Sequence, residues 1–217
     1  GSTIQMVGST ARILDEGGLI EGHLINNDFL IHGQGNIGSN RTQLTNHSTI
    51  RADVAGQTLT IDPDTRGMVN DGLLEASNTA TLQLNASGYD NTGGVIRAQA
   101  GSTVELASGP AISNGTLQTV GGGVIQTGNA SLASLTDVTL DGLLVVNNAD
   151  NVELVGTFTT NPSSVVRLDS LGSSTDLLIE TNVTLTGGGT IEMIGSGARI
   201  LDEGGLIEGH LINNDHL

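Results

Sequence analysis

The sequence predicts an all-β fold, a right-handed parallel β-helix with about eight rungs in each 187-residue repeat. Three observations support this fold class. The apolar residues are almost all aliphatic, a turn rich in Asn, Asp or Gly recurs every 20 to 27 residues, and the first 30 residues return at the end of the sequence. A coil with about three short strands per turn accounts for all three, because every rung repeats the same bends and stacks its inward side chains on the next rung.

The composition favours strands with a thin aliphatic core. The 217 residues include 32 Gly but only 2 Phe, 1 Tyr and no Trp. A globular core usually buries several aromatic side chains, whereas the 36% of apolar residues here are nearly all Val, Ile, Leu and Ala. Asn, Thr, Ser and Gly fill most of the remainder and favour turns and strands. No segment shows apolar residues at a sustained helical spacing, so we expect little or no helix.

The strongest signal is a duplication. Residues 1–30 and 188–217 match at 25 of 30 positions, and Thr3 aligns with Thr190, so the period is 190 − 3 = 187 residues. Near-identity over this length indicates tandem duplication within a longer array. The pairs that differ are Ser2/Gly189, Gln5/Glu192, Val7/Ile194, Thr10/Gly197 and Phe29/His216.

The two periods together predict the organisation of the chain. Residues 1–217 should form a single β-solenoid segment, in which 1–187 are one full long repeat and 188–217 are the start of the next. Within the long repeat, a polar turn precedes each alternating strand, and the eight intervals between strand starts add up to the long period. We therefore expect eight rungs per repeat. The predicted strands begin at Phe29, Thr49, Leu73, Val95, Thr116, Leu143, Val165, Thr190 and His216.

Alternation within these strands predicts which side chains point inward. In the segment that begins at Thr49, Ile50 and Ala52 should face the core and Arg51 the solvent. Asn residues tolerate left-handed conformations at the bends, and their amides can pair in ladders between rungs. The same alternation predicts inward pairs at Leu74/Ala76, Ile96/Ala98, Val166/Leu168 and Ile191/Met193, and in a second strand of the rungs at Leu59/Ile61, Leu82/Leu84, Val104/Leu106, Val138/Leu140 and Val183/Leu185.

The charge excludes some partners. Asp and Glu number 23 against 7 Arg and no Lys, giving a net charge of −16. Phosphate backbones would be repelled, so we expect no nucleic-acid partner, and no apolar run is long enough to predict membrane insertion. The absence of Cys excludes a disulfide scaffold and a thiolate metal site. Such an acidic surface favours solubility and can attract divalent cations.

No residue pattern predicts a catalytic or cofactor-binding site. The weak candidates for calcium are Asp62 and Asp64, two carboxylates separated by Pro63, although an ordinary Asx turn is the favoured interpretation. A second acidic group could be a metal site, but a solvated loop on the outer face is the favoured interpretation. It consists of Asp15, Glu16, Glu21 and His23, and it recurs as Asp202, Glu203, Glu208 and His210.

An enzyme is the main alternative, because polysaccharide lyases and tailspike glycosidases share this architecture. Glycosidase chemistry needs two carboxylates across a cleft, but the chain has no Lys, almost no aromatic platform for sugars and no long inserted loop. We therefore predict no enzymatic activity. Paired threonines at Thr58/Thr60 and Thr184/Thr186 also suggest an ice-binding surface, but such pairs do not recur on every rung. The carboxylates that could approach one another on neighbouring rungs are Asp53, Asp62, Asp64, Glu75 and Glu105.

The rungs themselves resemble a known family. Residues 70–76 (NDGLLEA) and 91–98 (NTGGVIRA) are similar to rungs of filamentous-haemagglutinin-type adhesins and autotransporter passenger domains. The resemblance implies a bacterial protein, extracellular or displayed on the cell surface, that serves as a stalk, adhesin or fibre, and it brings no fixed catalytic residues. The near-identical long repeat favours a long fibre. The expected partners are adjacent copies of the same repeat, covalently linked or end to end, with surface glycans or neighbouring fibres as further candidates.

Overall fold

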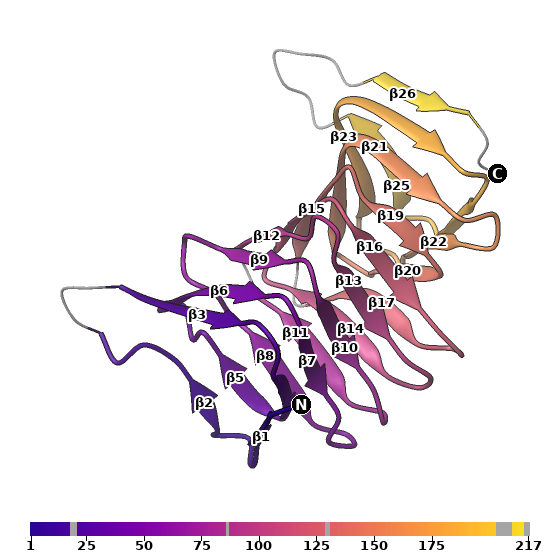
Figure 1. Ribbon diagram of the computed structural model, residues 1–217. Coiled ribbons are helices and arrows are strands. Elements are labelled where there is room, and N and C mark those ends of the chain that lie inside the picture. The colour runs from indigo at the N-terminus through magenta and orange to yellow at the C-terminus, as the bar shows by residue number, and fades with distance from the viewer. Residues whose placement is uncertain (18–20, 86, 129–130, 203–209, 215–217) are drawn as a thin grey trace.

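The computed structural model describes residues 1–17, 21–85, 87–128, 131–202 and 210–214. Within these residues every regular element is a β-strand, and all neighbouring strands pair in parallel. The chain winds from the N-terminus to the C-terminus as a β-solenoid of about eight turns (Figure 1). The predicted all-β, parallel coil is confirmed.

Three faces run along the coil, and we name them by the strands that stack on each. Face A contains β1 (Thr3–Met6), β4 (Leu30–Gly33), β7 (Thr49–Ala52), β10 (Leu73–Ala76), β13 (Val95–Ala98), β16 (Thr116–Thr119), β19 (Thr139–Asp141) and β26 (His210–Asn213). Face B contains β2 (Arg12–Ile13), β5 (Gly35–Ile37), β8 (Thr58–Ile61), β11 (Thr81–Leu84), β14 (Thr103–Ala107), β17 (Val124–Gly128), β20 (Leu143–Asn147), β22 (Val165–Asp169) and β24 (Thr190–Ile194). Face C contains β3 (Gly22–Asn26), β6 (Thr42–Asn46), β9 (Met68–Asn70), β12 (Gly88–Asp90), β15 (Ala111–Ser113), β18 (Leu132–Thr136) and β25 (Ala198–Asp202). Two longer strands, β21 (Asn151–Thr160) and β23 (Thr175–Thr186), begin on face C and end on face A.

Aliphatic stacks fill the space between the faces. Strand β10 pairs in register with β7 on one side and β13 on the other, so Leu74 lies between Ile50 and Ile96, and all three are at most 2% exposed. Each inward side chain thus packs against its equivalent one turn away, and the predicted in/out alternation of these strands is confirmed. Few aromatics fit such a core; Tyr89 and Phe158 are its largest buried side chains.

A ladder of buried asparagine amides runs along the edge between faces C and A. Asn46 Nδ2 donates to Asn70 Oδ1 at 2.7 Å, and Asn70 Nδ2 donates to Asn91 Oδ1 at 2.6 Å. Asn26 Nδ2 opens the ladder by donating to Asn46 Oδ1 at 2.9 Å. All four side chains are buried and hydrogen-bonded, which confirms the predicted pairing of amides between turns.

The predicted series of strand starts follows a single face only as far as Thr116. β16 pairs with β19, so the next start on face A is Thr139, whereas Leu143, Val165 and Thr190 begin strands on face B. Asp141 and Gly142 lie at a corner in the middle of one turn of the coil, although the same residue types elsewhere precede the first strand of a turn. The prediction that these strands all occupy the same face of successive turns is therefore wrong. His216 lies outside the described residues.

The inward residues are reassigned accordingly. Val166 is 2% exposed and inward, but it belongs to face B and does not stack with Ile50 and Ile96. The second predicted set is likewise divided, since Leu59, Leu82 and Val104 stack on face B while Val138/Leu140 and Val183/Leu185 lie on face A.

The duplicated segment occupies different faces in its two copies. From β1 to the end of β23, face A holds nine successive strands, which is eight turns, and β24 then lies one face further on. One long repeat therefore equals eight turns plus one face rather than eight turns. The copies of β1, β2 and β3 on faces A, B and C are β24, β25 and β26 on faces B, C and A. The positions that face inward nevertheless correspond in register, with Ile4, Met6, Ile13 and Leu24 matching Ile191, Met193, Ile200 and Leu211. Met6 is 4% exposed, whereas Met193, which was predicted to be buried, is 50% exposed.

Candidate functional site

The two calcium candidates lie at the corner after β8 but differ in their surroundings. Burial raises the pKa of Asp62 and outweighs the hydrogen bonds from Asn85 and Asn36 that act in the opposite direction. The hydrogen bond from Arg66 lowers the pKa of Asp64, whose Oδ2 lies 2.5 Å from Arg66 Nη2. Arg66 already neutralises Asp64, so the corner does not offer two free carboxylates to a cation. Within the described residues, no group of three His, Cys, Asp or Glu is placed to hold a metal ion.

The second acidic group shapes a loop. Asp15 accepts hydrogen bonds from the backbone N–H groups of Gly17 at 3.1 Å and Gly22 at 3.0 Å, which closes the loop on itself. Glu21 instead forms an ion pair with Arg66 at 3.2 Å. His23 Nε2 lies 2.9 Å from Thr45 Oγ1 on the next turn. These contacts fit a solvated loop. In the second copy Asp202 ends β25 and His210 begins β26, while Glu203 and Glu208 lie outside the described residues.

The remaining carboxylates that might have formed a catalytic pair are spread over the coil. Asp53 Oδ2 lies 2.7 Å from His32 Nδ1, just beyond face A. Glu105 on β14 belongs to face B and accepts a hydrogen bond from Gln83 at 3.0 Å. Glu75 on β10 belongs to face A. Each has its own partner, whereas Asp62 and Asp64 line a common pocket.

Glu75 is the most strongly held carboxylate, and alternation alone did not reveal it. It points outward yet is only 2% exposed, because two arginines from neighbouring turns cover it. Its carboxylate accepts from Arg51 Nε at 2.6 Å, from Arg97 Nη2 at 2.7 Å and from Gln99 Nε2 at 2.8 Å. Burial acts to raise the pKa of Glu75, but these bonds outweigh it and lower the pKa below its ordinary value. The cluster ties three turns together.

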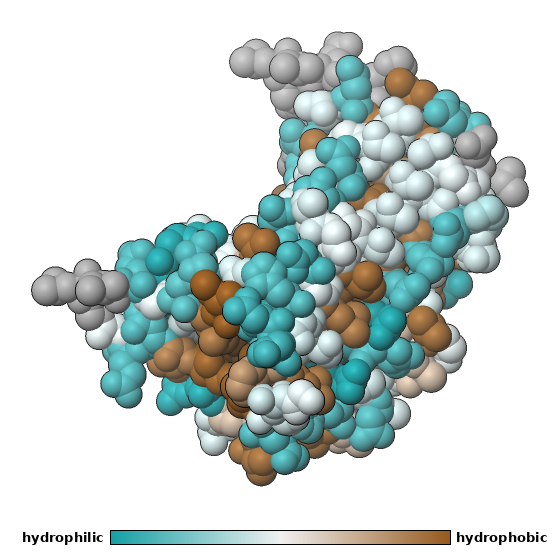
Figure 2. Space-filling model, in the orientation of Figure 1, coloured by the Kyte–Doolittle hydropathy of each residue, from teal (hydrophilic) through white to brown (hydrophobic). Residues whose placement is uncertain are grey.

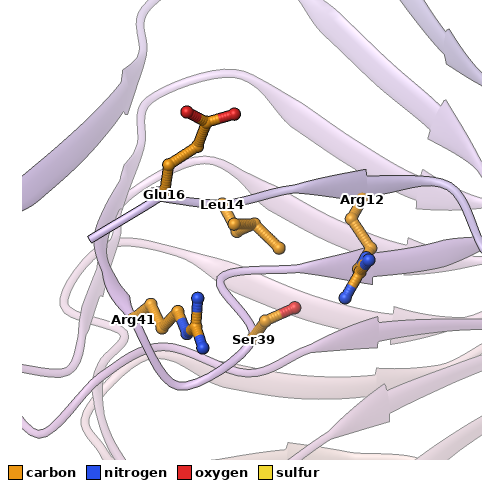
Figure 3. A pocket seen from close by; sticks show the side chains of 5 residues that line it. All are labelled: Arg12, Leu14, Glu16, Ser39 and Arg41. Atoms are coloured by element: carbon orange, nitrogen blue, oxygen red, sulfur yellow. The ribbon is translucent and has the colours of Figure 1, made fainter.

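A pocket of about 470 Å³ opens beside two other arginines, Arg12 and Arg41. Figure 3 shows their guanidinium groups on either side of Ser39, with the carboxylate of Glu16 directed away from both. Ser39 has a left-handed backbone (φ 50°) at the corner that brings these groups together. Among the described residues, Arg12 and Arg41 are the arginines without a carboxylate in ion-pair contact; the other five, Arg51, Arg66, Arg97, Arg167 and Arg199, all have one. Sequence reasoning missed this pocket, and the signal was the small number of arginines in an acidic chain.

The second copy shows which contact an arginine at the position of Arg12 makes when a preceding turn of the coil lies beside it. Its equivalent, Arg199, donates from Nε and Nη2 to the two carboxylate oxygens of Asp176, each at 2.7 Å. This bidentate geometry is the one that arginine prefers with carboxylates. The pocket could therefore accept an anionic group, but the position of Arg12 in the repeat also suits a structural ion pair.

Face A carries a short column of threonines that the sequence pattern did not reveal. The column spans four turns, and its members are half-buried. In the two preceding turns the same column holds Val95 and Leu73. The predicted pairs at Thr58/Thr60 and Thr184/Thr186 lie on faces B and A, so no regular ice-binding plane results. The column is Thr116, Thr139, Thr159 and Thr186.

Comparisons of the chain with protein-family models, curated proteins and solved structures find no match. Within the described residues there is no helix that could cross a bilayer. Any assignment of function must therefore come from the coil and its repeat.

Proposed function

We propose that this chain is a non-catalytic structural segment of a long extracellular or cell-surface fibre or adhesin stalk, of the kind that the filamentous-haemagglutinin-like rungs imply. The supporting observation is that the second copy of the duplicated segment continues the coil. β24, β25 and β26 stack on β22 and β23 with the same residues inward as in the first copy. A new repeat therefore extends the same solenoid without starting a new domain.

The mechanism that follows is mechanical. Hydrogen bonds between turns run along the axis, the aliphatic stacks exclude water from the interior, and the Asn ladder and the Glu75 cluster bind adjacent turns to one another. The net charge of −16 keeps neighbouring fibres apart unless cations bridge them. None of these features requires a bound substrate.

The first prediction concerns length. Eight turns plus one face, at about 4.8 Å per turn, amount to about 40 Å per repeat. Chains extended by one and two further 187-residue units should appear in electron micrographs as unbranched rods that lengthen by about 40 Å per unit. The reason is that each unit docks on the last turn of the one before it. Separate beads joined by thin connections would show that the units fold independently and would contradict the proposal.

A second candidate function, binding of an acidic polysaccharide, is favoured by the Arg12–Arg41 pocket alone. Guanidinium groups recognise carboxylates and sulfates through paired hydrogen bonds. If the pocket serves this function, a uronate oligosaccharide should bind saturably in calorimetry, and Arg41→Gln should abolish binding. Arg167→Gln is the control, because Arg167 pairs with Glu192 on the surface. Absence of binding, or equal loss in both variants, would reject this candidate, and cleavage of the oligosaccharide would point instead to an enzyme.

A further inference from the structure

The two copies of the duplicated segment differ where the second copy meets the turn before it. Strand β24 pairs with β22, β25 and β26 pair with β23, and Gly189 contacts Thr160 at the end of β21, so residues 160–186 form the surface on which the second copy docks. Four of the five differing positions, Gly189, Glu192, Ile194 and Gly197, contact this surface, and the fifth, His216, lies outside the described residues. Each of these four differences therefore bears on how the second copy fits the turn before it.

Gly197 lies too close to the preceding turn to carry a side chain. Its N–H donates to Ser170 Oγ at 3.2 Å, and its carbonyl accepts from Thr175 N–H at 2.9 Å. A Cβ at this position would lie 2.0 Å from the carbonyl oxygen of Ser173 and 2.6 Å from Ser170 Oγ. The first copy has Thr10 here. A threonine could not take this place without moving the backbone of the turn beneath it.

Gly189 shows the same restriction. Its N–H donates to Thr160 Oγ1 at 2.9 Å, and a Cβ would lie 2.5 Å from that oxygen and 2.8 Å from Thr160 Cβ. Thr160 is 3% exposed, so its side chain has little room to withdraw. The first copy has Ser2 here. A third difference also favours the second copy over the first at this surface. Glu192 forms an ion pair with Arg167 at 2.9 Å, whereas the first copy has the uncharged Gln5 at this position.

The rest of the first copy would fit the same surface. Arg12 is the equivalent of Arg199 and could make the same bidentate pair with Asp176. The inward residues Ile4 and Ile13 correspond to Ile191 and Ile200, which pack against the core. What separates the two copies is therefore a small number of side chains, of which Ser2 and Thr10 meet the severe overlaps.

We propose that β22, β23 and the corner at Thr160 that precedes them form a docking surface for the opening segment of the following repeat, and that Ser2 and Thr10 exclude the opening segment of a second copy of this chain from it. The proposal concerns contact between copies, and it holds whether or not the assembled chain serves as a fibre. It predicts that copies associate in the order of the repeats and not in any order.

Several apolar side chains of the first copy are exposed. Ile4 is 38% exposed, Val7 77%, Ile25 52% and Phe29 38%. Figure 2 shows hydrophobic residues gathered near the N-terminal turns, with further hydrophobic residues among the hydrophilic and near-neutral ones over the rest of the visible face. Open edges with apolar residues recruit other strands, and proteins commonly obstruct them. Two side chains that clash with the best-fitting partner serve this purpose.

Two full-length variants test the proposal. The acceptor, Gly189→Ser with Gly197→Thr, should release its own β24 and β25, which limited proteolysis would detect, and leave β22 and β23 free. The donor, Ser2→Gly with Thr10→Gly, should remove the obstruction at its opening segment. In native mass spectrometry we expect acceptor and donor to form a 1:1 complex. Acceptor with wild type, and each variant alone, should associate at least tenfold more weakly, and a chain with all four changes should form longer head-to-tail oligomers.

Each alternative outcome overturns the proposal. If the acceptor binds wild type as tightly as it binds the donor, Ser2 and Thr10 do not discriminate. If β24 and β25 of the acceptor stay as resistant to protease as in wild type, side chains fit at positions 189 and 197 and no steric exclusion exists. If the released acceptor binds neither wild type nor donor, β22 and β23 are not a docking surface for this segment.

Discussion

Ile96→Asp is expected to unfold the central turns of the solenoid. Ile96 is fully buried on face A, where β13 lies between β10 and β16, so the variant would place a carboxylate between the stacked side chains of Leu74 and Leu117. A buried, unpaired carboxylate with no hydrogen-bond donors costs several kcal/mol, about 4 or more here. Urea denaturation should show this loss, and hydrogen exchange should localise it to β10, β13 and β16.

The matched control is Thr58→Asp. Thr58 is exposed on β8 and points away from the core, so this change should alter the free energy of unfolding by no more than about 0.5 kcal/mol. Arg97, the outward neighbour of Ile96, is not suitable as a control, because Arg97→Asp would break the bond to Glu75 and add a second carboxylate beside it. If Ile96→Asp melts like wild type while Thr58→Asp does not, the in/out register is wrong by one residue.

The local rules of the coil could be predicted from the sequence. Alternation placed Ile50, Leu74 and Ile96 inward, and Asn before a turn predicted the amide ladder, because both depend on the two-residue period of a strand and on backbone conformations that few residues tolerate. These rules act within one strand or one bend. They do not specify which of three similar faces a strand joins.

The face assignment failed where two kinds of corner use the same residues. Asp141 and Gly142 look like Asp71 and Gly72, but the first pair bends the chain from face A to face B and the second from face C to face A. The residue types of a corner predict that the chain bends there. Which two faces the bend connects depends on how many residues each face contains in that turn of the coil. The 187-residue period therefore looked like eight turns, although it is eight turns plus one face.

The polar contacts could not be predicted because they join residues on separate turns. Arg51 and Arg97 were expected to face water, as alternation requires, but each lies one turn from Glu75 and together they enclose it. Arg12 and Arg41 are brought to one pocket only by the corner at Ser39. Both the Glu75 cluster and the Arg12–Arg41 pocket depend on which residues lie side by side on neighbouring turns, and the sequence alone does not give this register.

Glu75→Gln is expected to have the largest effect of any outward-facing substitution considered for this coil. The variant keeps the size of the side chain but loses the charge that binds Arg51 and Arg97. Breaking a buried ion pair by removing one partner typically costs about 3–5 kcal/mol, and because the two arginine side chains are 34% and 27% exposed and can turn to water, we expect about 2–3 kcal/mol. Glu192→Gln is the matched control: its partner Arg167 and Glu192 itself are 36% and 39% exposed, so the loss should stay below about 1 kcal/mol.

The effect of Glu75→Gln should also depend on pH, in a direction set by the pKa of Glu75. Because the pKa of Glu75 is lower in the folded chain than its ordinary value, its charge adds stability above about pH 4.3, the ordinary pKa of Glu, and this contribution is lost as the pH falls through the lowered value. The difference in free energy of unfolding between wild type and Glu75→Gln, measured in urea from pH 7 to pH 3, should therefore be constant down to about pH 5 and shrink below it. A difference that grew on acidification would mean that Glu75 is held protonated, and the ion-pair cluster would then not be the link between the three turns.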